Sequence, residues 1–339
     1  MAWYRESKRT WLEKLCIDVL KCGSIPKHVA FIMDGNRRYA TKNGMEKLQG
    51  HALGFEKLSE TLEWCLDLGI TEVTVYTFSI ENFKRPKEEV DCLMNLAREK
   101  FQDLLQEKEK LDKYGVCIRI FGDITLLPED IQMLIADVVL YTYNNSKTYL
   151  NVCFAYTSRE EITNATKEIA QEVVAGNLFP CDITENIFNR SLYSCKSSNP
   201  DIVVRTSGEV RLSDFLLWQS SYSVLYFFQV LWPEFKIWHL FLAVLFYQHH
   251  SKTLKVIKER HYQQMTQLEE KEDTVSAIQE HQKMHENPLQ HKFPLDVLEI
   301  RGQMEIRRKN YLNQLDSERY RRLICIKNGQ TKQNSPPVS

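Results

Sequence analysis

The sequence lacks the features that define several large classes of protein. Its most apolar region, residues 215–247, is interrupted by Pro233, Glu234 and Lys236. The final run of that region is far shorter than the roughly 20 residues that a membrane span needs. Residues 1–22 contain no continuous apolar core of the kind found in a cleavable signal peptide. We therefore expect neither a transmembrane span nor a cleaved leader.

Net charge and nucleotide-binding motifs are lacking as well. The 339 residues include 44 Lys and Arg against 45 Asp and Glu, a net charge of −1, so no global field attracts nucleic acid. The loops Gly-x-x-x-x-Gly-Lys-Ser/Thr and Gly-x-Gly-x-x-Gly, which bind nucleotides, are absent. The nine cysteines occur singly, and Cys65, Cys117 and Cys153 lie in apolar segments. We expect these three to be reduced core thiols.

Two hydrophobic periodicities alternate along the first 250 residues, one typical of buried strands and the other of amphipathic helices. Strands are predicted at residues 29–33, 72–79, 116–121, 150–155, 201–204 and 224–228. Helices are predicted at residues 46–68, 87–114 and 159–176, with others beginning near Pro128, at Ser213 and from Phe235. This alternation indicates an α/β fold with a largely parallel central sheet covered by helices.

Both ends of the chain differ from this central part. Residues 3–21 have an apolar face beside basic residues, which predicts an amphipathic helix; a membrane surface and the chain's own domain are equally suitable partners for it. From Ser251 onward charged residues dominate, Pro288 and Pro294 separate two helical stretches, and residues 330–339 are predicted to be disordered. The predicted parts are an N-terminal helix, a main domain and a charged helical tail, at residues 1–23, 24–250 and 251–339.

Two predicted strands end in polar groups that suit phosphate. The apolar run that ends at Met33 is followed by Asp-Gly-Asn-Arg-Arg, residues 34–38, and the run that ends at Val204 by Arg-Thr-Ser-Gly-Glu-Val-Arg-Leu-Ser, residues 205–213. The carboxyl ends of parallel strands are where open α/β sheets bind ligands. A carboxylate can hold a divalent cation, and arginines bind phosphate oxygens. The sequence therefore predicts a site for a diphosphate and a metal, although Asp-Gly alone is also a common turn pair.

These stretches resemble the cis-prenyltransferases, the family of undecaprenyl and dehydrodolichyl diphosphate synthases, over about residues 28–247. Further blocks of the family occur in its order at Tyr76–Pro86, Arg119–Asp123, Asn151–Tyr156, Phe215–Gln219 and Leu231–Glu234. Each block alone is weak, but the ordered set is specific. Within the family, the chain is most similar to the catalytic subunits of the eukaryotic dehydrodolichyl diphosphate synthases.

The resemblance implies a Mg²⁺-dependent enzyme with residues 24–250 as its catalytic domain. Its substrates would be farnesyl diphosphate and isopentenyl diphosphate, and its product a long-chain, cis-type polyprenyl diphosphate (dehydrodolichyl diphosphate) for dolichol synthesis and protein glycosylation. The Asp-Asp-x-x-Asp motif of the unrelated trans-type synthases is absent. A non-catalytic regulatory paralogue is the alternative, but such subunits typically lose the aspartate and the phosphate-binding arginines that this chain retains.

The resemblance also assigns the site residues. It implies that Asp34 holds Mg²⁺ against the allylic diphosphate and that Asn82 orients isopentenyl diphosphate and relays its proton. The residues implied at the allylic diphosphate are Asp34, Gly35, Asn36, Arg37, Arg38 and His51, of which His51 could equally be structural. The residues implied at isopentenyl diphosphate are Ser79, Arg85, Arg205, Arg211 and Ser213. Taken alone, the last three are two surface arginines and a helix cap. Apolar residues that could line a product tunnel are Phe31, Phe55, Trp64, Leu93, Leu96 and Phe154, which are core residues by default.

Departures from the family pattern predict a partner. Lys47 replaces an arginine found in many members of the family, and Val224 replaces an acidic residue of the single-subunit bacterial enzymes. The Arg-x-Gly motif of those enzymes is not found, and Arg301-Gly302 does not fit it. The resemblance therefore implies a Nogo-B-receptor-like non-catalytic subunit that completes the site and docks on the strand region 224–232 and the following helix. It also implies a peripheral protein on the cytosolic side of the endoplasmic reticulum membrane.

Overall fold

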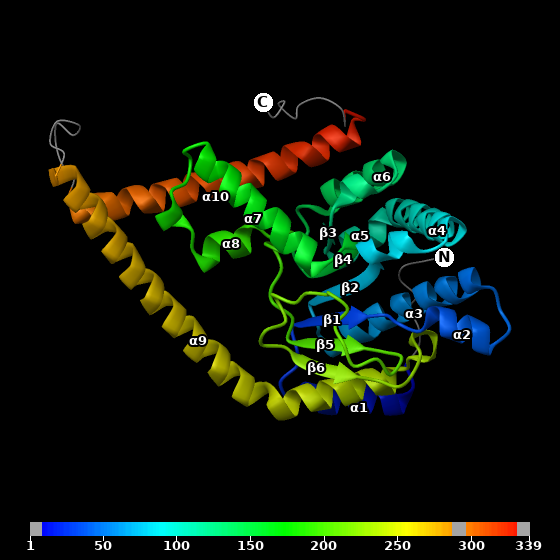
Figure 1. The fold of residues 1–339 in the computed structure, drawn as a ribbon. Coiled ribbons are helices and arrows are strands. Elements are labelled where there is room, and N and C mark those ends of the chain that lie inside the picture. The colour runs from blue at the N-terminus through cyan, green and yellow to red at the C-terminus, as the bar shows by residue number, and fades with distance from the viewer. Residues whose placement is uncertain (1–8, 287–295, 331–339) are drawn as a thin grey trace. The chain divides into compact units, whose positions relative to one another are not determined.

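Six parallel strands form one central sheet in the computed structural model, which describes residues 9–286 and 296–330 (Figure 1). The strands are β1 (His28–Ile32), β2 (Glu72–Ser79), β3 (Val116–Phe121), β4 (Thr148–Tyr156), β5 (Ile202–Arg205) and β6 (Val224–Phe227). Their order across the sheet is β3-β4-β2-β1-β5-β6, and every neighbouring pair is parallel. The predicted α/β fold is confirmed, and the strands lie close to their predicted bounds.

The order of the strands reverses at β1. The chain leaves β1 for β2 on one side and later returns to place β5 on the other side. Ile32, the last residue of β1, is level with Tyr76 of β2 and with Arg205 of β5. In open parallel sheets, ligands bind outside the carboxyl ends of the strands at such a reversal. The loops that follow β1, β2 and β5 therefore form the expected position of a site.

Ten α-helices accompany the strands in the part of the chain that the structure describes. They are α1 (Trp11–Lys21), α2 (Asn36–Lys42), α3 (Lys47–Leu68), α4 (Lys87–Gln106), α5 (Lys108–Tyr114), α6 (Glu129–Thr142), α7 (Ser158–Val174), α8 (Glu185–Ser191), α9 (Ile237–Glu286) and α10 (Val297–Lys327). The single helix predicted at residues 87–114 is two helices, because Glu107 leaves the helical conformation between α4 and α5. The helices predicted at 46–68 and 159–176 are confirmed as α3 and α7.

The helix predicted to begin at Ser213 does not form. Ser213, Asp214 and Leu216 have positive φ angles of 50°, 60° and 46°, which a right-handed helix does not contain. Contacts from elsewhere in the chain hold this shape: the Ser158 N–H donates to the Asp214 carbonyl at 2.8 Å, and the Tyr76 hydroxyl donates to the Ser213 carbonyl at 3.3 Å. Tertiary contacts therefore fix the segment after β5.

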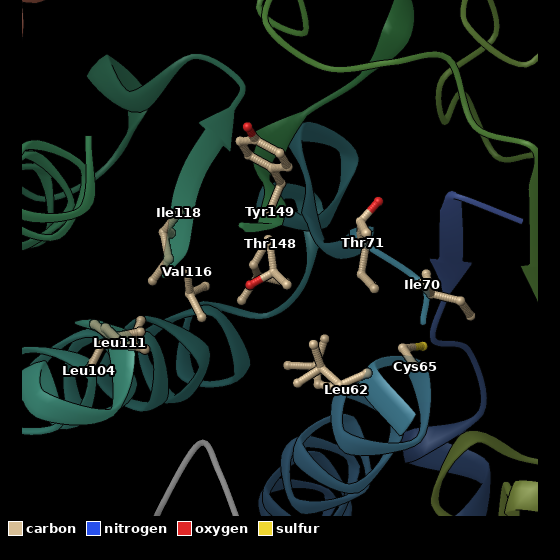
Figure 2. A pocket seen from close by; sticks show the side chains of 13 residues that line it. Leu62, Cys65, Ile70, Thr71, Leu104, Leu111, Val116, Ile118, Thr148 and Tyr149 are labelled. Carbon is tan, nitrogen blue, oxygen red and sulfur yellow. The ribbon is translucent and has the colours of Figure 1, made fainter. Parts of the chain in front are cut away.

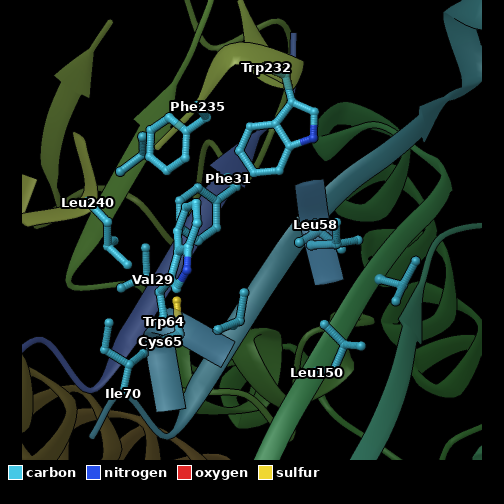
Figure 3. Packing of buried hydrophobic residues seen from close by; sticks show 14 of the residues in the cluster. Val29, Phe31, Leu58, Trp64, Cys65, Ile70, Leu150, Trp232, Phe235 and Leu240 are labelled. Atoms are coloured by element: carbon cyan, nitrogen blue, oxygen red, sulfur yellow. The ribbon is translucent and has the colours of Figure 1, made fainter. Parts of the chain in front are cut away.

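An aromatic cluster fills the space between β1, α3 and the turn before α9 (Figure 3). Phe31, Trp232 and Phe235 are almost fully buried, and the Trp232 and Phe235 rings stack with their centroids 5.4 Å apart. Trp232 Nε1 also donates a hydrogen bond to the Gly54 carbonyl at 2.7 Å. Because buried aromatic rings remove much apolar area from water, this cluster anchors the turn to the sheet and to α3.

Burial of the cysteines agrees with the prediction. Cys65, Cys117 and Cys153 are buried, and all three are free thiols. None of the helices in residues 9–286 and 296–330 is long and apolar enough to cross a membrane.

The N-terminal helix begins later than predicted. Thr10 closes a capping box, so α1 starts at Trp11; residues 3–8 lie outside the described residues. Ile17 and Leu20 on one side are buried in the main core. The apolar residues left exposed on α1 are Trp11, Leu12, Leu15 and Val19. Packing onto the chain's own domain thus accounts for only part of the apolar face.

Most of the two tail helices packs with residues 161–196. Contacts divide the chain into a first unit that holds the sheet and a second unit made of residues 161–196 and 255–322. Within the second unit, Ile169, Leu178 and Ile187 share a core with Tyr311 and Leu315. The two charged helical stretches are present in α9 and α10. Pro288, Pro294 and all but the first residue of the segment 330–339, which was predicted to be disordered, lie outside the described residues.

Candidate active site

The polar loops after β1 and β5 contact each other directly. Arg205 ends β5, and its guanidinium NH2 donates to Asp34 Oδ2 at 2.9 Å. The Thr206 hydroxyl donates to the Asp34 carbonyl at 2.7 Å, and the Trp232 N–H donates to the same carbonyl at 3.1 Å. Thr206 and Trp232 thus hold the backbone of Asp34 while Arg205 holds its carboxylate. The two strand ends that the sequence predicted to meet do meet.

Arg205 is buried and is not a surface arginine. Its side chain is 3% exposed. Its NH1 donates to the Arg211 carbonyl and, at 2.7 Å, to the Ser213 hydroxyl. Arg205 therefore connects Asp34 with the segment 211–213, and it brings three of the predicted site residues to the same place.

Asp34 is ionised over the ordinary pH range. Burial alone would raise its pKa, but the hydrogen bond and charge of Arg205, together with Ser207 and Arg38, bring the pKa below its usual value. The side chain remains 36% exposed. Among the described residues no group of three His, Cys, Asp or Glu side chains could hold a metal. A single partly exposed carboxylate fits Mg²⁺, which usually takes one or two carboxylates and completes its shell with water and substrate phosphates.

Close backbone approach shapes the loop after Asp34. Gly35 has φ +111°, and a Cβ there would lie 2.9 Å from a Leu231 side-chain carbon. Asn36 begins α2 and packs on α3 so tightly that a Cβ on Gly54 would lie 2.4 Å from Asn36 Oδ1. That Oδ1 is buried, with no hydrogen-bond partner in the described part of the chain. Gly35 is therefore required by its backbone conformation, and Gly54 leaves the room in which the Asn36 side chain is held beside the site.

A cation cluster made of Arg37, Lys47 and Arg85 lies at this edge of the sheet. All three contact the carboxylate of Glu89 on α4. The cluster brings together Arg37 and Arg85, which the resemblance had assigned to different substrates. Lys47 belongs to the same cluster, and its ammonium supplies charge without the bidentate geometry of arginine.

His51 on α3 lies beside the cation cluster. Burial, followed by the charges of Arg85 and Arg37, lowers its pKa to about 4, and Glu89 opposes this only in part. The imidazole is therefore neutral at physiological pH. Its Nε2 is buried and has no hydrogen-bond partner among the described residues. Nε2 of the neutral imidazole can therefore either donate a hydrogen bond to a bound ligand or accept one from it.

A second carboxylate, Glu209, pairs with two arginines. Its Oε1 lies 3.5 Å from the Arg38 guanidinium, and its Oε2 contacts the Arg211 guanidinium. Glu209 thereby links an arginine assigned to the allylic diphosphate with one assigned to isopentenyl diphosphate. Sequence reasoning missed Glu209 and Glu89 because an acidic residue among arginines does not suggest a phosphate site by itself.

Ser79 and Asn82 have local roles that sequence reasoning also missed. Asn82 Oδ1 accepts from the Ser79 N–H at 3.1 Å, and Ser79 Oγ accepts from the Glu81 N–H at 3.2 Å. These bonds cap the 3₁₀ turn Ile80–Lys84 that ends β2 and leads into Arg85. The two residues therefore shape the loop that carries Arg85.

An apolar cavity of about 130 Å³ begins at the site. Asn36 and His51 are polar members of its lining. Four of the six predicted tunnel residues line the cavity, namely Phe55, Leu93, Leu96 and Phe154. Phe31 and Trp64 do not line it and belong to the core. The cavity lies between α3, α4 and the sheet.

A smaller cavity of about 50 Å³ lies at the opposite, amino-terminal end of the strands (Figure 2). Leu62 of α3 and Leu104 of α4 line it. These residues follow Leu58 and Phe101, which line the first cavity, by about one helical turn. The two cavities therefore occupy successive levels of the space between α3, α4 and the sheet.

Comparison with known proteins agrees with this geometry. The family profile described as "Putative undecaprenyl diphosphate synthase" matches residues 32–255. The chain belongs to this family, the cis-prenyltransferases. The match begins at the last residue of β1 and includes the loops of Asp34, Arg85 and Arg205.

Known relatives are similar in sequence to most of this chain. The human dehydrodolichyl diphosphate synthase complex subunit DHDDS is 55% identical over 278 residues, which cover 81% of this chain and 84% of the human protein. The tritrans,polycis-undecaprenyl-diphosphate synthase (geranylgeranyl-diphosphate specific) of Methanocaldococcus jannaschii is 44% identical, covering 71% of this chain and 86% of that protein. The crystal structure of lavandulyl diphosphate synthase from Lavandula x intermedia with dimethylallyl diphosphate has a TM-score of 0.63 and 33% identity, covering 66% of this chain and 95% of that one.

The close contact of Gly54 with Asn36 leads to a prediction about anion binding. We expect Gly54→Ala to displace Asn36 and to weaken the binding of inorganic pyrophosphate about tenfold, because small misplacements at such sites are costly. Isothermal titration of the purified protein measures the dissociation constant. Gly302→Ala is the control, since a Cβ there meets nothing within 4 Å. Unchanged affinity in Gly54→Ala would contradict the role given to this contact.

Proposed function

We propose that this cis-prenyltransferase extends farnesyl diphosphate by successive isopentenyl units to give dehydrodolichyl diphosphate, the precursor of dolichol for protein glycosylation. One observation carries the proposal: Asp34 and Arg205 meet at the reversal point of the sheet, where an apolar cavity begins beside the cation cluster. A site with cationic side chains beside an apolar cavity suits a substrate that has a diphosphate group at one end and a prenyl chain at the other. The names of the human and mouse relatives support the product class.

The allylic substrate would place its diphosphate against residues 34–38. A Mg²⁺ ion held by Asp34 would help to neutralise the leaving diphosphate. The guanidiniums of Arg37 and Arg38 would stabilise the negative charge that develops on the diphosphate as the C1–O bond breaks, an interaction stronger in the transition state than in the ground state. Asn36 and neutral His51 would orient the phosphate oxygens.

The second substrate would bind on the segment after β5. Arg211 and Ser213, with Arg205 behind them and Arg85 opposite, would hold the diphosphate of isopentenyl diphosphate. Its double bond then attacks allylic C1, pyrophosphate leaves, and a proton is lost from C2 of the isopentenyl unit. An amide is a poor base, so Asn82 would relay this proton and orient the substrate together with Ser79.

The growing chain would occupy the apolar cavity. The cavity lies between α3, α4 and the sheet, and the smaller cavity continues the same space toward the other end of the strands. Each new unit keeps the diphosphate and stays beside the cations, so the units added earlier would move further into the cavity and exchange water for apolar contacts. Such a path accounts for a long product better than a closed pocket does.

A carboxylate variant tests the assignment. We expect Asp34→Ala to lose prenyl transfer by at least about 10²–10³-fold, because the carboxylate proposed to hold the metal is removed. Incorporation of labelled isopentenyl diphosphate into polyprenyl product measures the rate. Asp91→Ala, at an exposed position on α4, is the control. Wild-type incorporation by Asp34→Ala at saturating Mg²⁺ would refute the assignment.

A second subunit is part of the proposal. The human and mouse relatives are named as complex subunits. In this chain β6 is an edge strand, and Leu225 on it is exposed. Trp238, Leu242 and Leu245 near the start of α9 are also 41–50% exposed. We propose that a Nogo-B-receptor-like, non-catalytic subunit covers this apolar surface and adds cationic groups to the diphosphate site.

The partner proposal predicts that one surface change separates the subunits. Leu242→Arg should abolish co-purification with the partner and reduce specific activity to that of the chain alone, because a charge would be buried in the interface. Leu298→Arg, at a 73% exposed position on α10, is the control. Equal specific activity of the isolated chain and of the complex would count against the whole proposal.

Contact with the endoplasmic reticulum membrane, from its cytosolic side, is proposed for α1. Trp11, Leu15 and Val19 follow one another at four-residue spacing and are exposed, with Lys14 between them. An exposed apolar stripe beside basic residues is typical of a helix that lies in a membrane interface. The contact would be peripheral.

We expect that replacing Trp11 and Leu15 by serine lowers co-sedimentation with liposomes of anionic and neutral phospholipid. The reason is the loss of the apolar area that enters the interface. Val174→Ser, at an 89% exposed position on α7, is the control. If the double variant sediments like the unaltered protein, α1 has only its packing role.

A further inference from the structure

Glu89 is the carboxylate at the centre of the cation cluster. Its Oε1 accepts a hydrogen bond from Arg85 NH1 at 3.1 Å and lies 3.6 Å from Arg37 NH1, and its Oε2 lies 3.8 Å from Lys47 Nζ. The Glu89 side chain is only 11% exposed. Three positive charges and one negative charge leave the group with a net charge of +2.

The arrangement differs from an ordinary pair on a helix surface. Arg85 lies outside the helix, in an extended conformation between the 3₁₀ turn and α4. Arg37 and Lys47 come from α2 and from the start of α3. One largely buried carboxylate therefore gathers cations from three separate segments. In the absence of a ligand it limits the repulsion among them.

We propose that Glu89 is a positioning residue that takes the place of a phosphate group in the cation cluster and competes with bound diphosphate, so that pyrophosphate is released quickly after each condensation. The inference rests on the proposed function, because the cluster must bind a diphosphate of substrate or product. Glu89 itself does not contact the reacting atoms in this mechanism. It acts through Arg85, Arg37 and Lys47.

Charge explains why such a competitor is useful. A synthase that adds many units must discharge one pyrophosphate per unit, and cations that bind the anion tightly in the ground state slow that step without lowering the chemical barrier. A fixed negative charge within reach of the same cations weakens the binding of the anion and pairs again with Arg37 when the anion leaves. The same charge keeps the guanidiniums in place for the next substrate.

Removing the charge of Glu89 while keeping its shape tests the proposal. In Glu89→Gln the amide oxygen can still accept from Arg85, but the net charge of the cluster rises from +2 to +3. We expect the dissociation constant of inorganic pyrophosphate, measured by isothermal titration of the full-length protein, to fall about tenfold, with a steeper dependence on salt. Glu89→Asp, which keeps the charge, should remain within about threefold of the unaltered protein.

Kinetics separate this role from a merely structural one. In Glu89→Gln, steady-state kcat should fall because release is slower, and KM for farnesyl diphosphate should fall as well. The rate of a single turnover should stay unchanged, since the chemical step keeps its arginines. A fold defect would instead lower the single-turnover rate and weaken the binding of pyrophosphate.

The matched control is Glu88→Gln, which makes the same charge change at the neighbouring, exposed position of α4. We expect pyrophosphate binding and kcat in this variant to equal those of the unaltered protein. Unchanged or weaker pyrophosphate binding in Glu89→Gln, or equal tightening in Glu88→Gln, overturns the inference. If the unaltered protein binds no pyrophosphate at all, the proposed function fails instead.

Discussion

The ion pair between Asp34 and Arg205 is the contact on which the rest of the site depends. It joins the end of β1 to the end of β5 across the point where the strand order reverses. Arg205 is buried and also holds the Ser213 hydroxyl and the Arg211 carbonyl. Loss of either partner would leave the other charge poorly solvated, a cost of several kcal/mol in buried pairs. One guanidinium thus sets the position of both the proposed metal carboxylate and the loop after β5.

Charge balance governs the surroundings of that pair. Arginines and a lysine from α2, α3 and the turn after β2 converge at one edge of the sheet, where their mutual repulsion is limited by Glu89 and Glu209. Positive charge also acts on the titratable groups: Arg205 is the main cause of the lowered pKa of Asp34, and the cation cluster adds to burial in lowering that of His51. The site is therefore prepared for anions, with a carboxylate that stays ionised and an imidazole that stays neutral.

Apolar packing supplies the second half of the site. Trp232 ties the turn before α9 to α3 through the Gly54 carbonyl, and a side chain at Gly54 would collide with Asn36. α3 packs tightly against α2 near Gly54. Between α3, α4 and the sheet the packing leaves a cavity, which begins beside the cations. The packing of α3 against α2 and α4 thus gives the site a charged entrance and an apolar interior.

Periodicity determined the sheet, because strands buried on both faces are continuous apolar runs, and the polar residues that follow such runs must gather at its carboxyl edge. From the sequence alone, Asp34 and Arg205 could therefore be expected to meet. The left-handed backbone at Ser213 and the cations around Glu89 were decided by tertiary contacts. Local sequence determines which backbone conformations neighbouring residues prefer. These features instead depend on contacts between groups that are far apart in the sequence and that only the fold brings together.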